Sequence, residues 1–126
     1  MKSTLFAGIL VMSSIAAAQP KTALVIHGGA GVISRQNMSE SQQAAYEQAL
    51  NAALDAGNAV LQRGGSAREA VIASVVLLED SPLFNAGKGA VYNAEGGHEL
   101  DASIMEGHTR KAGAVAGVRT IKNPIL

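Results

Sequence analysis

Two helix-start signals constrain the fold of this 126-residue chain more than any other feature. Ser39 is followed three residues later by Gln42, and Ser66 is followed by Glu69, which is the capping-box pattern at the beginning of a helix. Between the two boxes, apolar residues recur at the helical period until the pair Gly64-Gly65. These apolar positions are Tyr46, Ala49, Leu50, Ala53, Leu54, Gly57, Val60 and Leu61. The sequence therefore predicts two helices joined as a hairpin.

The second predicted helix runs to about Asp80, because Pro82 cannot continue it. Its apolar face consists of Ala70, Val71, Ser74, Val75 and Leu78. In the first helix, Gly57 and the many alanines keep the apolar stripe thin. We therefore expect the first helix to pack closely against a flat neighbour such as a sheet.

Four stretches have the residue pattern of strands. Residues 22–26 form a short apolar run that ends at the glycine-rich turn 27–31, and this run predicts a buried strand. Later in the chain, residues 90–93, 98–105 and 111–119 predict a meander of strands joined by glycine-containing turns. In the second of these, Leu100, Ala102 and Ile104 alternate with Glu99, Asp101 and Ser103. The order of elements indicates an α/β fold with helices layered on an antiparallel or mixed sheet.

Residues 1–18 have the pattern of a secretory signal peptide. Lys2 is followed by an apolar run and then by small residues that end at Ala18. A membrane anchor is disfavoured, because it needs about 20 apolar residues and Ser13-Ser14 interrupt this run. We therefore expect a single domain of residues 19–126 in the periplasm or outside the cell, with no membrane association once the signal peptide is removed.

The composition excludes some classes of function. Ten Lys and Arg balance ten Asp and Glu, so the chain has no net charge that would attract nucleic acid or an anionic membrane. The chain has no Cys, which excludes a disulfide scaffold. With only four aromatic residues, any core has to be built from Ala, Val, Leu and Ile.

Several polar groups suggest chemistry when each is considered locally. The turn 27–31 could bind a phosphate or carboxylate through its amides, although its glycines equally suit a tight turn. Three histidines could hold zinc with nearby carboxylates, yet they lack the His-x-x-x-His spacing of a helical site. A hydrolase triad could be drawn from Ser103, His98 and Asp101, but no Gly-x-Ser-x-Gly elbow is present. The possible zinc ligands are His27, His98, His108, Glu99 and Asp101. The structural roles are the favoured interpretation.

The segment 78–92 is the most unusual in the chain. The predicted second helix ends there and is followed by Pro82, an apolar Leu83-Phe84 pair that we expect to be packed against the protein, Asn85 and two glycines. Carbonyl groups freed at the helix end could surround a hard cation or pack on the protein. Asn85 could donate its amide to an oxyanion or a water, or it could bond its own backbone as a turn residue. From the residues alone, these alternatives stay open.

Three segments carry more information together than any of them does alone. They are residues 24–31 (LVIHGGAG), 82–91 (PLFNAGKGAV) and 98–107 (HELDASIMEG), the last followed by 111–118 (KAGAVAGV). Together they closely resemble the plant-type L-asparaginases, also called isoaspartyl peptidases, which are N-terminal nucleophile hydrolases. The resemblance implies an αββα sandwich, of which this chain holds the N-terminal portion. It also implies hydrolysis of L-asparagine and of isoaspartyl (β-aspartyl) peptide bonds.

The catalytic nucleophile of that family has no counterpart here. Family members cleave themselves between a Gly and a Thr, and the new N-terminal Thr is both nucleophile and, through its α-amine, general base. The chain contains no Gly-Thr dipeptide, and its threonines do not match the nucleophile motif. The resemblance therefore implies part of an α subunit that is inactive on its own.

Other roles follow from the resemblance residue by residue. The family's sodium-binding loop uses main-chain oxygens at positions that correspond here to Leu78, Glu79, Ser81, Phe84, Ala86 and Lys88. Asn85 corresponds to a loop asparagine near the nucleophile, where it supports catalysis by holding water or polarising the substrate carbonyl. Gly28 and Gly29 correspond to the turn that lines the active site. His27 corresponds to part of the framework at the end of the preceding strand. No catalytic cofactor is implied, only a structural sodium ion.

The resemblance also implies partners. They are a small-molecule substrate and the remainder of the chain's own precursor, which is the β subunit of an αβ heterodimer that dimerises again. A glycosylasparaginase-like amidohydrolase of the same superfamily is one alternative. A small periplasmic module that binds an anion at residues 28–31 is an alternative of a different class.

Overall fold

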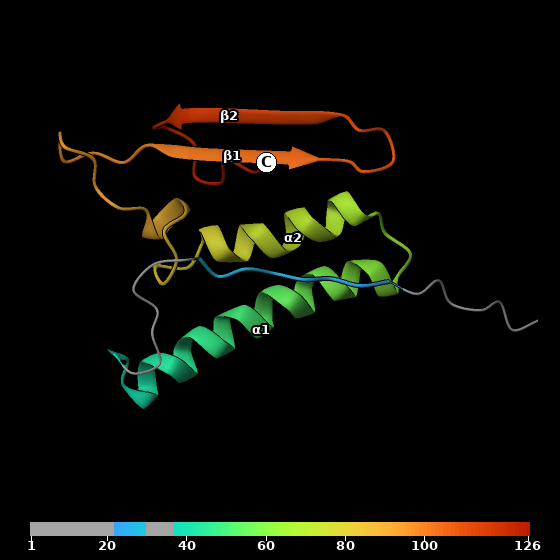
Figure 1. Ribbon diagram of the computed structural model, residues 1–126, viewed down its shortest axis with the longest axis horizontal. Coiled ribbons are helices and arrows are strands. Elements are labelled where there is room, and N and C mark those ends of the chain that lie inside the picture. Colours follow the sequence, from blue (N-terminus) through green and yellow to red (C-terminus); the bar gives the residue numbers. More distant parts are fainter. Residues whose placement is uncertain (1–21, 30–36) are drawn as a thin grey trace, which may run out of the picture.

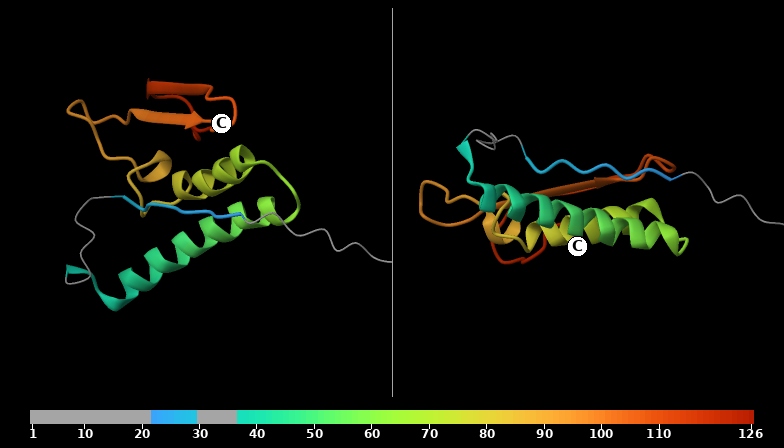
Figure 2. Two further views of the ribbon diagram at one scale, coloured as in Figure 1. Left: turned by 45° about the vertical axis from the view of Figure 1, so that its right-hand side comes forward. Right: turned by 90° about the horizontal axis from the view of Figure 1, so that it is seen from below.

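The computed structural model describes residues 22–29 and 37–126, which form a helix pair beside a two-stranded sheet (Figure 1). In chain order the elements are α1 (Glu40–Gln62), α2 (Ala67–Glu79), a short 3₁₀ turn η2 (Gly87–Gly89), β1 (Leu100–Met105) and β2 (Ala112–Val118). Figure 1 and the left view of Figure 2 place α2 between α1 and the strands. The predicted signal peptide lies outside the described residues.

Both helices begin where the sequence predicts, and for the predicted reason. The backbone N–H of Gln42 donates to Ser39 Oγ at 3.2 Å, and the N–H of Ser39 donates back to Gln42 Oε1 at 2.9 Å. The same pair of bonds joins Ser66 and Glu69, at 3.2 Å and 2.8 Å. Each box satisfies amides that the first turn of a helix leaves without partners. The predicted hairpin is therefore confirmed.

The helices come into close contact at Gly57 of α1. A Cβ built there would collide with Ser74 Oγ and would lie 2.6 Å from Leu24 Cδ2. Ser74 is buried and donates its hydroxyl to the carbonyl oxygen of Ala53 at 2.8 Å, so the polar group is satisfied at the contact. The buried apolar residues are Ala53, Val60, Ala70 and Phe84. The predicted neighbour of α1 was wrong for the described residues: there α1 packs on α2 and on residues 22–29, and not on the sheet.

The two strands form an antiparallel ladder with one irregularity. Leu100 pairs with Val118 and Met105 with Ala112, and the register shifts between Leu100 and Ala102. At this bulge Gly117 has φ +65°, and its N–H donates to Asp101 Oδ1 at 2.8 Å. Half-buried residues alternate with exposed ones along β1, as predicted. Both strands are shorter than predicted, since residues 98–99, 111 and 119 lie outside them.

Two other predicted strands are not strands in the described part of the chain. Residues 22–26 are extended but unpaired, and they run along the helices on one side of the pair (Figures 1 and 2). Leu24 and Ile26 are half-buried, whereas Val25 is 89% exposed, so the prediction of a buried strand was wrong. The physical reason is that no described strand lies beside this segment to exchange backbone hydrogen bonds with it.

Residues 90–93 are the second wrong strand prediction. The N–H of Val91 donates to the side chain of Asn85 at 2.9 Å, and the N–H of Asn93 donates to the Gly97 carbonyl at 2.8 Å. These bonds close a loop and a turn, so the backbone groups are not available for a ladder. Among the described helices, none is long and apolar enough to cross a membrane.

Candidate functional site

The loop that follows α2 is folded so tightly that two of its positions accept only glycine. A Cβ on Gly87, which has φ +50°, would collide with the carbonyl oxygen of Glu79. A Cβ on Gly89 would collide with the carbonyl oxygen of Phe84 and would lie 2.9 Å from that of Pro82. The loop therefore packs main-chain oxygens into a space that a side chain would fill.

Several oxygens of the predicted cation loop also accept hydrogen bonds within it. Ser81 N–H donates to the Leu78 carbonyl at 3.3 Å, and Ala86 N–H donates to the Phe84 carbonyl at 2.8 Å. The Ala86 carbonyl accepts from Gly89 N–H at 3.0 Å. A carbonyl oxygen has two lone pairs, so such a bond leaves it able to bind a cation as well. Carbonyl oxygens are hard ligand atoms, which suit a hard cation such as sodium.

Asn85 lies in this loop with an exposed side chain, and its two polar ends differ. Oδ1 accepts the hydrogen bond from Val91 N–H, which fixes the side chain across six residues of loop. Within the described part of the chain, Nδ2 has no hydrogen-bond partner. The structural role of Asn85 therefore uses its oxygen and leaves the nitrogen available as a donor.

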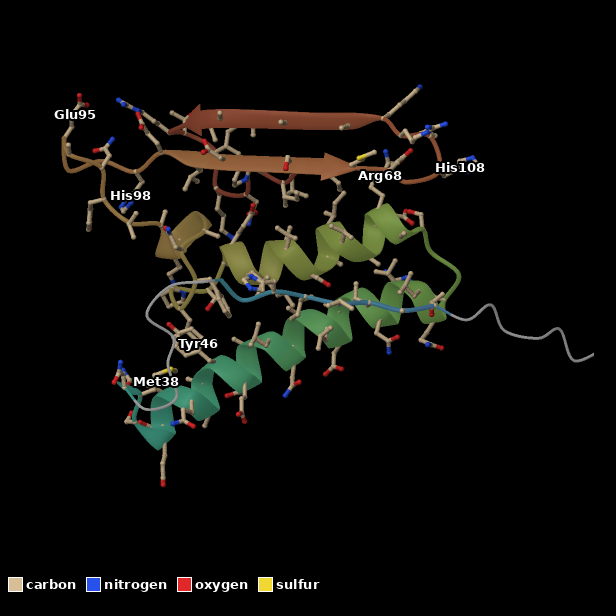
Figure 3. All side chains as sticks on the ribbon, in the orientation of Figure 1. Met38, Tyr46, Arg68, Glu95, His98 and His108 are labelled. Atoms are coloured by element: carbon tan, nitrogen blue, oxygen red, sulfur yellow. The ribbon has the colours of Figure 1, made fainter. Side chains whose placement is uncertain are left out.

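The glycine turn lies against the same loop. A Cβ on Gly28 would be 3.1 Å from Leu50 Cδ2 and 3.4 Å from Phe84 Cε1. The Phe84 ring in turn contacts the Tyr46 ring edge to face, with centroids 5.7 Å apart; Tyr46 is labelled in Figure 3. Phe84 is thus packed between α1 and the turn. The structure brings Gly28 beside the residue that precedes Asn85.

Gly29 has a different requirement from Gly28. Its φ is +114°, and no atom lies within 4 Å of the position of a Cβ, so conformation and not space favours glycine there. Its N–H donates to Nδ1 of the exposed His27 at 3.2 Å. One amide of the proposed anion-binding turn is therefore already used, and residues 30–31 of that turn lie outside the described residues.

The zinc and triad clusters that were considered from the sequence and disfavoured are not assembled in the described residues. Nδ1 of His98 contacts the Val91 carbonyl oxygen at 3.2 Å, and Asp101 accepts from Gly117 N–H, so the triad with Ser103 does not form. Figure 3 shows His98 and His108 at opposite ends of the sheet. No group of three or more His, Asp or Glu side chains suited to a metal occurs in residues 22–29 and 37–126.

The functional interpretation of the sequence considered only the main-chain oxygen of Glu79 and missed its buried side chain at the end of α2. Glu79 is only 3% exposed, and both of its carboxylate oxygens accept hydrogen bonds from residues near the C-terminal end of the sequence. The only local signal was a carboxylate directly after the apolar run 75–78. Next to it, hydrogen bonds from Lys122 and then from Asn123 hold the pKa of Asp80 below its usual range.

An ion pair lies at each end of the two-stranded sheet. Arg119 binds Glu99 across the β1–β2 pair, and hydrogen bonding to this guanidinium lowers the pKa of Glu99. At the opposite end, Arg68 Nη1 of α2 lies 3.2 Å from Glu106 Oε1 (Figure 3). All four side chains are at least one-third exposed, so each pair orients its elements and contributes little stability.

Comparison with known proteins shows which family the sequence is similar to. A family model described as asparaginase matches residues 20–126. The chain is 52% identical over 106 residues to the isoaspartyl peptidase of Salmonella typhimurium, covering 84% of this chain and 34% of that protein. It is 52% identical to the isoaspartyl peptidase of Escherichia coli, and 47% identical over 102 residues to the isoaspartyl peptidase/L-asparaginase of Danio rerio. The chain spans about one third of the length of these relatives.

Proposed function

Since this chain belongs to the asparaginase family, we propose that it is the N-terminal third of a hydrolase that cleaves L-asparagine and isoaspartyl peptide bonds. The observation that carries the proposal is the match of residues 20–126 to the asparaginase family model, together with relatives over 102–106 residues that are named for these activities. The juxtaposition of Gly28 with the loop of Asn85 supports it, because a turn and a donor-bearing loop would then share one wall of the site.

In this proposal the nucleophile comes from residues of the precursor that follow residue 126. The 126 residues contain no Gly-Thr dipeptide, so the Thr released by self-cleavage belongs to a β subunit formed from the rest of the precursor. Asn85 contributes its Nδ2, which donates a hydrogen bond to the substrate carbonyl or to the attacking water. Gly28 and Gly29 form the wall beside it.

The rest of the precursor also completes the fold. Large apolar side chains are exposed in this chain, and they include Val25, Val91, Tyr92, Met105 and Leu126. An unpaired extended segment at residues 22–26 and a two-stranded sheet both leave backbone groups free for further strands. We therefore assign this chain to one part of an αββα sandwich, with the remaining strands supplied by the precursor.

A sodium ion fits the loop after α2 in this proposal. It would be held by the main-chain oxygens of Leu78, Glu79, Ser81, Phe84, Ala86 and Lys88. The close approach of the Glu79 and Phe84 carbonyls to Gly87 and Gly89 supports the assignment. When bound, sodium supplies positive charge that neutralises converging carbonyl dipoles and stiffens the loop. Replacing sodium by N-methylglucamine should lower the melting temperature of the complete gene product, and an unchanged value would remove the ion from the proposal.

The proposed cellular setting follows from residues 1–18. As a signal peptide they would direct the protein to the periplasm or the exterior and then be removed. There the α and β subunits would remain together as a heterodimer that dimerises again. Mass spectrometry of the secreted protein should find an N-terminus at Gln19, whereas a retained Met1 would contradict this step.

The decisive test of the function is to read the gene beyond codon 126. We expect a downstream Gly-Thr that is followed by Val-Gly-Ala-Val-like residues. We also expect the complete gene product to hydrolyse L-asparagine and a β-aspartyl dipeptide. An immediate stop codon would make the chain a remnant and defeat the proposal. Residues 19–126 alone should hydrolyse neither substrate. Selective turnover of glycosylasparagine would instead favour the glycosylasparaginase alternative.

A further inference from the structure

The strongest unassigned feature is the carboxylate of Glu79, the last residue of α2. A buried carboxylate is costly unless its oxygens are hydrogen-bonded, and here each oxygen has its own donor. Asn123 Nδ2 donates to Oε2 at 3.1 Å, and the backbone N–H of Ile125 donates to Oε1 at 3.2 Å. Both donors belong to the segment 121–126, which returns beside β1 (Figure 1). We call this set of bonds the Glu79 clamp.

Asn123 is oriented by two neighbouring carboxylates. Its Nδ2 also donates to Asp80 Oδ1 at 3.2 Å, so both amide hydrogens are engaged, and the residue is 8% exposed. Lys122 Nζ lies 2.8 Å from the same Asp80 oxygen and balances its charge. Turning the Asn123 amide over would place its oxygen against both carboxylates. The clamp therefore accepts a single orientation of this side chain.

On its other side, Glu79 contacts the loop that carries Asn85. A Cβ on Gly87 would collide with the Glu79 carbonyl oxygen and would lie 2.8 Å from the Glu79 Cβ. Glu79, Asn85, Gly87 and Pro124 all line one cavity of about 230 Å³. Glu79 is thus the point where α2, the loop and the C-terminal segment meet.

We propose that Glu79 is a positioning residue for the candidate site: its buried carboxylate holds the segment 121–126 against the loop and so fixes the position of Asn85. The effect on catalysis rests on the proposed function, whereas the mechanical coupling does not. Glu79 itself touches no substrate. It acts through the loop, in the same way that a supporting residue fixes the geometry of a group in an active site.

The variant Glu79→Gln tests this with little change of shape. Gln retains an oxygen for Ile125 N–H, but its Nε2 then faces Nδ2 of Asn123, so two donors oppose each other. If Asn123 turns over to accept that bond, its oxygen faces the Asp80 carboxylate. Glu95→Gln is the matched control, because it removes the same charge from an exposed turn. Both variants are made in the complete gene product.

Hydrogen exchange measured by mass spectrometry is the first readout. Glu79→Gln should speed exchange in peptides that cover residues 121–126 and in those that cover 82–91, including the amide of Val91 that donates to Asn85. Glu95→Gln should leave both unchanged. Faster exchange in 121–126 alone, or in neither peptide, would overturn the coupling whether or not the protein is a hydrolase.

Kinetics is the second readout, taken per folded active site and well below the melting temperature. Glu79→Gln should lower kcat for L-asparagine about tenfold with a smaller change in KM, as expected when the placement of a group that acts in the transition state is disturbed. In an Asn85→Ala background the same change should have little further effect. An additive loss in the double variant would overturn the action through Asn85. A wild-type protein without activity would instead count against the proposed function, with the exchange result standing separately.

Discussion

The two ends of α2 use the same chemical group in opposite ways. At its start, the Glu69 carboxylate accepts the N–H of Ser66, three residues away, and both residues are exposed. At its end, the Glu79 carboxylate accepts the N–H of Ile125, 46 residues away, and is buried. The first end is determined by adjacent sequence and needs nothing else. The hydrogen bonds at the second end form only when the segment 121–126 has folded back onto α2.

The largest effect is expected from breaking the loop that follows the buried end. Gly89→Ala would place a Cβ against the backbone carbonyls of Phe84 and Pro82, which cannot move away as a side chain could. We expect the complete gene product to lose about 3 kcal/mol of unfolding free energy, typical of severe overpacking. Urea denaturation would measure it. Gly113→Ala in β2, where a Cβ meets no atom within 4 Å, is the control and should be neutral or slightly stabilising.

A smaller loss is expected in the middle of the helix pair. Gly57→Ala improves helix propensity by about 1 kcal/mol, but the new methyl group collides with Ser74 Oγ and crowds Leu24. We expect a net loss of about 2 kcal/mol, because Ser74 would have to give up its bond to Ala53. The same denaturation experiment applies. Asn51→Ala on the exposed face of α1 should not destabilise, and a stabilised Gly57→Ala would show that the helices are free to separate.

The exposed start of α2 should be the more tolerant end. Ser66→Ala removes the hydroxyl that caps the Glu69 amide and should cost about 1 kcal/mol. Faster hydrogen exchange should be confined to the first turn of α2, since the cap is local. Ser66→Asn keeps an acceptor at the cap and should behave like the wild type. Exchange that spread to residues 121–126 would mean that the two ends are coupled after all.

The smallest expected effect is the loss of folding stability at acidic pH. Hydrogen bonds from the backbone and side chain of Ser66 lower the pKa of Glu69, and those from Lys122 and Asn123 lower the pKa of Asp80. A carboxyl with a lower pKa in the folded state stabilises the fold above its ordinary pKa and loses that contribution as the pH falls through the folded value. Stability should therefore decline below about pH 4, and less steeply in Glu69→Gln and in Asp80→Asn. Urea midpoints at pH values on either side of that point would measure the slopes; equal slopes in all three proteins would contradict the assignment.

The same contrast explains which parts of the fold the sequence predicts. The capping boxes and the helical period are read within a few residues, and both helix starts are correct. The alternation in β1 is also correct, because its partner β2 follows after a short turn. Residues 22–26 have an equally good strand pattern, but a strand needs a neighbour, and the described chain provides none.

In the candidate site, too, the sequence indicates individual residues but not the contacts between residues that are distant in the chain. The resemblance supplies Gly28, Gly29 and Asn85 as site residues, and the structure adds that Phe84 joins the turn to the loop. The bond from Val91 to Asn85 could not be predicted, since a strand pattern at 90–93 suggested other partners for that amide. Nor could the Glu79 clamp, because nothing near Asn123 in the sequence marks it as the partner of an acid 44 residues earlier.

That separation also sets an order of events during synthesis. The helix hairpin closes a short turn and can form as soon as its second helix leaves the ribosome. Asn123 is made 44 residues after Glu79, which at ordinary rates of translation is a delay of roughly 2–9 s. For that time the Glu79 carboxylate is solvated and the end of α2 is open. Residues 121–126, which are synthesised late, thus allow the buried Glu79 carboxylate to leave water.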